Sequence, residues 1–247
     1  MRQKIVITDL TQMPQGNKVC VIGINEQGRT IRPIHDNGFL KNYLYNRSQL
    51  IIFPRAIIEF DFIGEKPQPP HIEDMDFDPT FIKYHGLSDD TKWESTLLIT
   101  SFNTVNKIYE GNLKYGKWVP PGAKTRSIAT LSGSTEHSFI IEEGRAPKTR
   151  IRFLDASGNE YNLPVSDLAI RELCFSEVIR KGKAVADVAG ELNRAIAQIR
   201  KIYLRVGLAR AYKVEGAETE HCYPQITGIH TIPDYLNGKT FADFAKR

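Results

Sequence analysis

Cysteine is scarce in the sequence, and no long apolar run occurs in it. The three cysteines among the 247 residues, Cys20, Cys174 and Cys222, form no CxxC pair, and no histidine stands at zinc-knuckle spacing from them. An odd number of scattered thiols is typical of a reducing compartment. No stretch approaches the roughly 18 apolar residues of a membrane helix, and the first residues lead into a strand-like segment rather than a signal region. We therefore expect a cytoplasmic protein with no membrane partner.

Signatures of catalysis are also missing. None of the patterns GxxxxGK[ST], GxGxxG, HExxH or GxSxG occurs, so the chemistries that depend on them have no support. Glu59, Asp61, Glu65 and Lys66 resemble the carboxylate–lysine set of a nuclease, but Lys66 stands past a glycine in a proline-rich loop. We expect a binding protein that performs no catalysis and holds no cofactor or metal.

The composition is that of an ordinary globular protein with a mildly basic charge. Hydrophobic residues make up 41% and charged residues 25% of the chain, and the net charge is +4. A chain of this length admits one large domain or two small ones. The charge tolerates a polyanionic partner without requiring one.

Alternation of apolar and polar residues predicts strands in both halves of the chain. In the first half they cover 4–9, 18–24, 29–34, 56–63 and 71–76, with an irregular or short helical connector over 37–48. In the second half they cover 127–133, 138–143, 150–155, 160–164, 202–213 and 222–230, with a helical connector over 166–200. Residues 88–109 between the halves are predicted to be mostly helical, and 116–125 to form an exposed loop.

The same order of strands, glycine turn and connector occurs twice, which favours a duplicated unit. A five-stranded barrel with a helix between its third and fourth strands is the OB arrangement. We predict a mainly β protein with helical connectors: an OB-like barrel over 1–85, a helical bridge and loop over 86–117, and a second OB-like barrel with a helical insertion over 118–247. Another small antiparallel barrel or a sandwich fits the same pattern.

Several segments resemble the dual OB-containing domain family. They are Ile5-Val-Ile-Thr-Asp-Leu-Thr, Ile31-Arg-Pro-Ile, Pro69-Pro-His-Ile-Glu-Asp, Tyr203-Leu-Arg-Val-Gly-Leu-Ala-Arg, Gly228-Ile-His-Thr-Ile-Pro-Asp-Tyr-Leu and Phe241-Ala-Asp-Phe. The resemblance spans nearly the whole chain in the same order. It implies two OB domains in a stand-alone prokaryotic protein, and it bears on the fold far more than on function.

The strand predicted over 202–213 carries the strongest indication of a binding surface. Regular pleating turns its apolar residues to one face and basic and aromatic residues to the other. With two arginines of the preceding strand, this second set comprises Arg150, Arg152, Lys201, Tyr203, Arg205 and Lys213. Arg210 and Tyr212 join it only if a bulge near Gly207 shifts the pleat. Cations beside an aromatic stacking platform are typical of proteins that bind single strands, although a solvated face covered by a helix fits too.

A second set of candidates lies near strand ends in the first half. Histidine beside carboxylates can bind a divalent metal or act as acid and base, whereas arginine among them also forms structural ion pairs. The set comprises Asp9, Arg32, His35, Arg55, His71, Glu73 and Asp74. Alternation places His71 and Glu73 on one face and Asp74 on the other, so a pocket and an ion-pair network both remain open.

The favoured hypothesis is a protein that binds single-stranded RNA or DNA without catalysis, as an accessory module. One alternative is a nucleotide- or metal-dependent enzyme that uses His71, Glu73 and Asp9. The other is an adaptor whose sheet edges pair with a protein partner. Binding that weakens steeply as salt rises distinguishes the first hypothesis from the adaptor.

Overall fold

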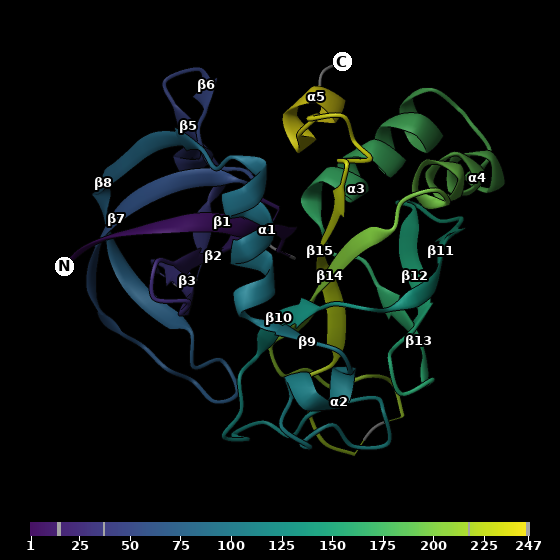
Figure 1. The fold of residues 1–247 in the computed structure, drawn as a ribbon, viewed down its shortest axis with the longest axis horizontal. Helices are drawn as coiled ribbons and strands as arrows, with labels where there is room; N and C mark the ends of the chain where they lie inside the picture. Colours follow the sequence, from purple (N-terminus) through teal and green to yellow (C-terminus); the bar gives the residue numbers. More distant parts are fainter. Residues whose placement is uncertain (14–15, 37, 217, 246–247) are drawn as a thin grey trace.

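The computed structural model describes residues 1–13, 16–36, 38–216 and 218–245. The chain is built mainly of strands, with short helices at the connections and at the C-terminal end (Figure 1). Asn37, the first residue of the expected connector, lies outside the described residues. None of the described helices is long and apolar enough to cross a membrane.

Five strands of the first half close into a barrel. They are β1 (Arg2–Gln12), β2 (Lys18–Asn25), β3 (Thr30–Ile34), β7 (Ala56–Glu65) and β8 (Asp74–Leu87). Hydrogen bonds join them in the ring β1-β2-β3-β8-β7-β1, in which β3 and β8 are parallel and the other pairs are antiparallel. This five-stranded ring is the OB arrangement.

The first barrel closes because alternate residues of its strands are apolar and point inward. Phe60 and Phe77 are fully buried, with ring centroids 5.4 Å apart, and Phe39 stacks on Phe77 at 5.2 Å. Phe39 belongs to the connector between β3 and β7, so this connector supplies part of the core. Its elements are β4 (Phe39–Leu40), the 3-10 turn η1 (Lys41–Leu44), β5 (Tyr45–Asn46) and β6 (Gln49–Leu50).

The second half repeats the ring with a first strand that is divided in two. β10 (Ile128–Leu131) pairs with β14 (Lys201–Leu208), and β11 (Thr135–Glu142) pairs with β12 (Lys148–Leu154). Gly133 lies between the two pieces with a φ of 74°, a conformation that glycine adopts without strain. β1 likewise pairs with two different strands. Its first residues pair with β7, and its later residues pair with β2.

The second ring continues through β13 (Glu160–Pro164) and β15 (Pro224–Ile232). β13 pairs with β12, and β15 pairs with β14. A parallel bridge between Val165 and Ile226 then joins β13 to β15, as β3 joins β8 in the first ring. The fold class predicted from the sequence is therefore confirmed: the chain is mainly β and repeats the OB arrangement.

Helices form the connection between β13 and β14, as the sequence predicts. They are α3 (Leu168–Phe175), the π-helical turn η2 (Ser176–Arg180) and α4 (Val185–Ile196). Asp167 caps α3, because its Oδ1 accepts the backbone N–H of Ala169 at 2.8 Å. The apolar side of α4 packs into the second core through Val188, Leu192 and Ile196.

The segment between the barrels is less helical than predicted. Instead of a mostly helical stretch over 88–109, the structure has α1 (Asp90–Ile99) and α2 (Val105–Ile108), separated by β9 (Ser101–Phe102). β9 pairs in parallel with β10, so the sheet of the second barrel takes up the middle of this segment. A last helix, α5 (Phe241–Ala245), packs against α3 (Figure 1).

The two barrels share a buried boundary. β1 of the first barrel lies beside β15 of the second. Val6, Trp93, Leu97 and Tyr203 form a small apolar cluster there, so strands of both barrels and α1 contribute to it. The central parts of the outer faces of β1 and β14 are therefore covered, while Lys4 and Lys201 near the ends of these faces are exposed.

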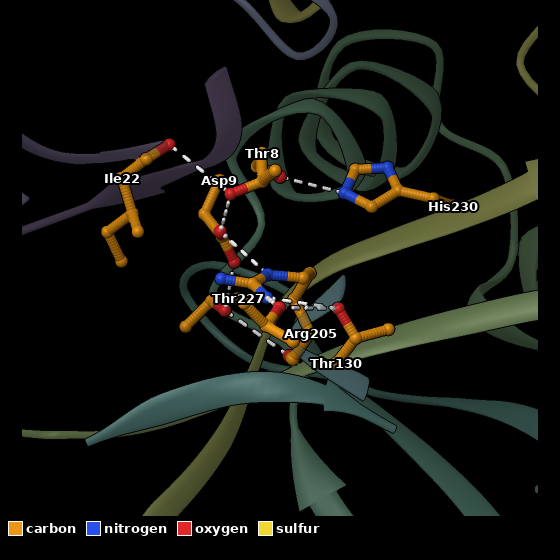
Figure 2. A network of polar contacts seen from close by, with 8 residues as sticks. Thr8, Asp9, Ile22, Thr130, Arg205, Thr227 and His230 are labelled. Atoms are coloured by element: carbon orange, nitrogen blue, oxygen red, sulfur yellow. Dashed lines mark hydrogen bonds and ion pairs between the residues drawn. The ribbon is translucent and has the colours of Figure 1, made fainter. Parts of the chain in front are cut away.

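Two strand irregularities meet at this boundary. Thr8 is an extra residue of β1 relative to β2, and Thr227 is an extra residue of β15 relative to β14. Bulges interrupt strict alternation and re-aim side chains. Here polar groups of both barrels come together: Thr227 Oγ1 donates to Asp9 Oδ1 at 2.5 Å, and His230 Nε2 donates to the Thr8 carbonyl at 2.7 Å (Figure 2).

A fully buried ion pair occupies the middle of the boundary. Arg205 of β14 reaches Asp9 of β1, with 2.9 Å between Nε and Oδ2, and neither side chain is exposed. Arg205 Nη1 also donates to the hydroxyls of Thr130 at 3.0 Å and Thr100 at 3.2 Å. Figure 2 shows Asp9, Thr130 and Arg205 converging from separate strands. Burial of a charge without its partner is costly, so each barrel depends on the other.

Removal of Asp9 is expected to destabilise the protein as a whole. Asp9→Ala leaves the Arg205 guanidinium buried without its counter-charge, and the free energy of unfolding should fall by about 3–5 kcal/mol. Urea denaturation measures this loss. Glu65→Ala is the control, because the Arg29–Glu65 ion pair is exposed and should contribute at most about 1 kcal/mol. Similar losses in the two variants would contradict the structural role of Asp9.

Candidate nucleic-acid interface

The outward basic face predicted on β14 is wrong for its two central residues. Tyr203 and Arg205 are buried, because the face of β14 that points away from its own core packs against the first barrel and α1. Arg205 is paired with Asp9, and Tyr203 Oη donates to Glu94 Oε1 at 2.6 Å. Burial, together with the Glu94 carboxylate, raises the pKa of Tyr203. Neither side chain is available to a nucleic acid.

The other basic residues of that predicted face differ in their surroundings. Lys201 forms an ion pair with Glu94, with 2.8 Å between Nζ and Oε1. Arg150 is half-buried and donates to the side-chain and backbone oxygens of Asn162. Arg152 is exposed on β12. The predicted strip is therefore interrupted at Arg205, and Arg152 remains as an exposed cation on the second strand of the barrel.

Arg210, Tyr212 and Lys213 lie in a loop rather than in a strand. β14 ends at Leu208, five residues before the predicted end, and residues 209–223 connect it to β15. Tyr212 is 46% exposed, and Lys213 is exposed as well. The connection between the fourth and fifth strands of an OB fold is one of the two loops that flank its binding face.

Five aromatic rings follow one another along this loop and a neighbouring one. Trp118 stacks on His221 with centroids 3.8 Å apart, and Tyr115, 87% exposed, lies 6.3 Å from Trp118. On the other side, Tyr223 lies 6.1 Å from His221 and 4.9 Å from Tyr212. Backbone bridges between residues 114 and 118 and between 212 and 221 support both loops. We name these five residues the aromatic loop surface.

Charges of both signs accompany the aromatic loop surface. Exposed lysines alternate with its rings or follow them in sequence, namely Lys114, Lys117 and Lys213. Exposed glutamates occupy the far part of the same loop, namely Glu215, Glu218 and Glu220. The lysines and glutamates partly cancel, so the rings are the distinctive feature of this surface.

The sequence contained a signal for part of this surface. Lys114-Tyr-Gly-Lys-Trp118 interleaves basic and aromatic residues, a pattern typical of single-strand binders, but the segment was expected only to be bridge and loop. His221 and Tyr223 have no such signal. They reach Trp118 and Tyr212 because a backbone bridge joins residues 212 and 221, and sequence spacing does not reveal that pairing.

The candidates of the first half lie mostly in contacts between the barrels. Asp74 accepts Arg32 Nε at 2.5 Å through one oxygen and Arg210 Nη2 at 2.5 Å through the other. Glu73 accepts the backbone N–H of Ser127 at 2.7 Å and its hydroxyl at 2.8 Å. Arg210 and Ser127 belong to the second half of the chain, so these two carboxylates join the two halves.

The remaining candidates of that set are dispersed. His35 is half-buried, with Nε2 3.4 Å from Asp36 Oδ2. Arg55 pairs with Asp90 at 2.6 Å, and Asp9 belongs to the buried pair with Arg205. Within the described ranges, no three His, Cys, Asp or Glu side chains gather closely enough to hold a metal ion.

The repeated ring of strands and the exposed loop between the last two strands define a protein of tandem OB folds. The sequence profile of the dual OB-containing domain family matches residues 3–229, and the chain belongs to that family. Among curated proteins, none matches the sequence. The family membership expected from the six segments is thus confirmed.

His71 differs from the other candidates in being a buried, neutral side chain. It is 3% exposed and lies close to the guanidinium groups of Arg32 and Arg210. Burial, assisted by these two cations, lowers the pKa of His71 to about 2. The folded protein therefore keeps His71 unprotonated at pH values at which the unfolded chain, with a pKa near 6.5, takes up a proton.

This difference makes the protein sensitive to acid through His71. Because its folded pKa is depressed, stability is full above pH 6.5 and is lost as the pH falls below that value. Between pH 7 and pH 5 the wild type should lose about 2 kcal/mol more than His71→Gln, which cannot titrate. Unfolding curves of both proteins at pH 5, 6 and 7 measure this difference, and parallel pH dependences would show that His71 is accessible to protons.

Proposed function

We propose that the chain binds single-stranded RNA or DNA, with bases stacked on the aromatic loop surface and phosphates held by the lysines beside it. The observation that carries this proposal is the run of five rings from Tyr115 to Tyr212, both of them exposed. An aromatic ring offers a stacking platform to any base. In OB folds, such platforms on the binding loops contact the nucleic-acid strand.

The mixture of positive and negative charges around the rings determines which interactions hold the nucleic-acid strand. Three exposed lysines and three exposed glutamates occur in these two loops, so stacking should contribute more to affinity than the release of counterions. Arg152 is exposed on the second strand of the same barrel, and the second and third strands form the binding face of an OB fold. In the proposed complex, Arg152 supplies a further phosphate contact.

Loss of one ring should weaken binding without unfolding the protein. Tyr212→Ala and Trp118→Ala each remove a stacking platform worth about 1–3 kcal/mol, which corresponds to a loss of about 5- to 150-fold in affinity. Filter binding with single- and double-stranded RNA and DNA measures the loss and identifies the preferred strand. Ile179→Ala is the control, because Ile179 is 45% exposed on η2, outside both loops. Unchanged affinity in both aromatic variants would reject the proposed surface.

The salt dependence of binding should be modest. With three to four phosphate contacts, the slope of log K against log salt should be about −2 to −3 for a single strand. Lys213→Gln should reduce the steepness by about 0.7. Lys183→Gln should leave it unchanged, because Lys183 is already paired with Glu177 and Glu191 on the helical insertion. Absence of any salt-sensitive binding to polyanions would instead favour a protein-binding adaptor.

A further inference from the structure

A cavity of about 360 Å³ lies at the boundary of the barrels, at the end of β15 remote from the aromatic loop surface. The first barrel and α1 line it with Leu10, Phe53 and Trp93, among others, and the second barrel lines it with residues 229–234 and with residues 236 and 238–241 of the C-terminal segment. Sites for small molecules are mostly apolar, hold a few placed polar groups and measure about 300–1,000 Å³. The cavity meets each of these conditions.

Two buried rings line the cavity and are held in fixed positions. Trp93 is 3% exposed and His230 is 8% exposed, and they meet edge to face with centroids 4.9 Å apart. The Thr8 carbonyl engages His230 Nε2 at 2.7 Å. Figure 2 shows His230 Nδ1 on the side of the ring turned away from Thr8. No described residue donates to Nδ1, so it is the polar atom of this ring left to meet a molecule in the cavity.

The protonation state of His230 defines what Nδ1 can do. Burial lowers the pKa of His230 to about 4, so the imidazole is neutral at physiological pH. Because Nε2 carries the proton that is donated to the Thr8 carbonyl, Nδ1 carries a lone pair and accepts. An acceptor in an apolar cavity favours a ligand that brings an N–H or O–H donor.

Several of the charged groups around the cavity are paired within the protein, whereas Lys239 has no ion-pair partner and Arg55 Nε no hydrogen-bond partner among the described residues. Arg55 pairs with Asp90 at 2.6 Å, and Asp167 accepts backbone N–H groups at the start of α3. Asp234 accepts the backbone N–H groups of residues 236 and 238. These pairings favour an uncharged ligand in the interior of the cavity.

We propose that this cavity binds a small planar heteroaromatic molecule with an N–H donor, a free nucleobase or nucleoside, as a ligand distinct from the strand at the loops. Trp93 supplies an aromatic wall, and His230 Nδ1 accepts the N–H of the ring or its amino group. Residues 224–228 of β15 separate Tyr223 of the loop surface from the nearest cavity-lining residue of that strand, Ile229, a span of about 20 Å at roughly 3.3 Å per residue. A single nucleotide therefore cannot occupy both.

The two tryptophans of the chain make the two sites separately observable. Trp93 lines the cavity, and Trp118 belongs to the aromatic loop surface. In Trp118→Phe, Trp93 is the remaining tryptophan, and adenosine should change its emission in a saturable way under excitation selective for tryptophan. In Trp93→Phe, Trp118 is the remaining tryptophan, and under the same excitation it should respond to a single-stranded oligonucleotide but not to adenosine. Failure of either proposal is thereby distinguished from failure of the other.

A matched pair of ligands tests the hydrogen bond to His230. Adenosine carries an amino donor that purine riboside lacks, so adenosine should bind about 2- to 12-fold more tightly, as expected for one hydrogen bond. In His230→Phe, which keeps a ring but removes the acceptor, this preference should disappear. Ala169→Phe fills the cavity from its α3 side and should abolish the Trp93 response to adenosine. Thermal unfolding of each variant verifies that it is folded.

Three outcomes would overturn the proposal. The first is no saturable change of Trp93 emission with adenosine, guanosine, cytidine or uridine at millimolar concentration. The second is an undiminished response in folded Ala169→Phe. The third is a Trp93 response to oligonucleotides alone, which would assign the cavity to a base of the bound strand instead of a free ligand.

Discussion

The buried pair of Asp9 and Arg205 is the constraint on which the rest of the structure depends. Both charges are withdrawn completely from water, and each is supplied by a different barrel. Such a pair is tolerated only when its geometry and its additional hydrogen bonds are good. The bulges at Thr8 and Thr227, and the hydroxyls of Thr100 and Thr130, provide these hydrogen bonds to Asp9 and to Arg205 Nη1, while Arg205 Nη2 has no partner among the described residues. They therefore also fix how the barrels sit against each other.

The same contact explains why the two barrels present unlike surfaces. In each barrel a loop joins the fourth strand to the fifth, over 66–73 in the first and 209–223 in the second. The first loop takes part in the boundary between the barrels. There the Pro69 carbonyl accepts the backbone N–H of Gly122, and the Glu73 carboxylate binds Ser127. The second loop keeps Tyr212 exposed. A duplicated fold has thus acquired one loop for assembly and one that is open to a partner.

Much of the fold could be predicted from the sequence because barrel strands alternate apolar and polar residues. Ile58, Phe60 and Phe62 of β7 follow that rule, and their strand was located closely. The rule failed on β14, where the residues opposite the core are buried too. Alternation distinguishes buried from exposed residues only when one face of the strand is exposed to solvent. Arg205 looks like a surface residue in the sequence, because its partner stands 196 positions away.

The candidate site was predictable only in part, because the alternation rule applies to strands and the site lies in loops. Lys213 was identified by strand parity and Tyr212 only on the condition of a bulge near Gly207, and neither argument applies to a loop that begins after Leu208. The local sequence pattern could have identified Tyr115 and Trp118, whereas the contact of Trp118 with His221 depends on the approach of two distant segments. The segments that resemble the family meet mainly at the boundary between the barrels. They therefore predicted the architecture and gave little information about ligands.

One consequence of the shared ion pair concerns how its two residues can be replaced. A fragment that ended near α1 would retain the carboxylate of Asp9 without a guanidinium, and the complementary fragment would retain the reverse. The two residues therefore constrain each other's replacement: loss of either charge alone leaves the other buried without a partner, and an exchange of one barrel between relatives succeeds only where the incoming half restores the missing charge.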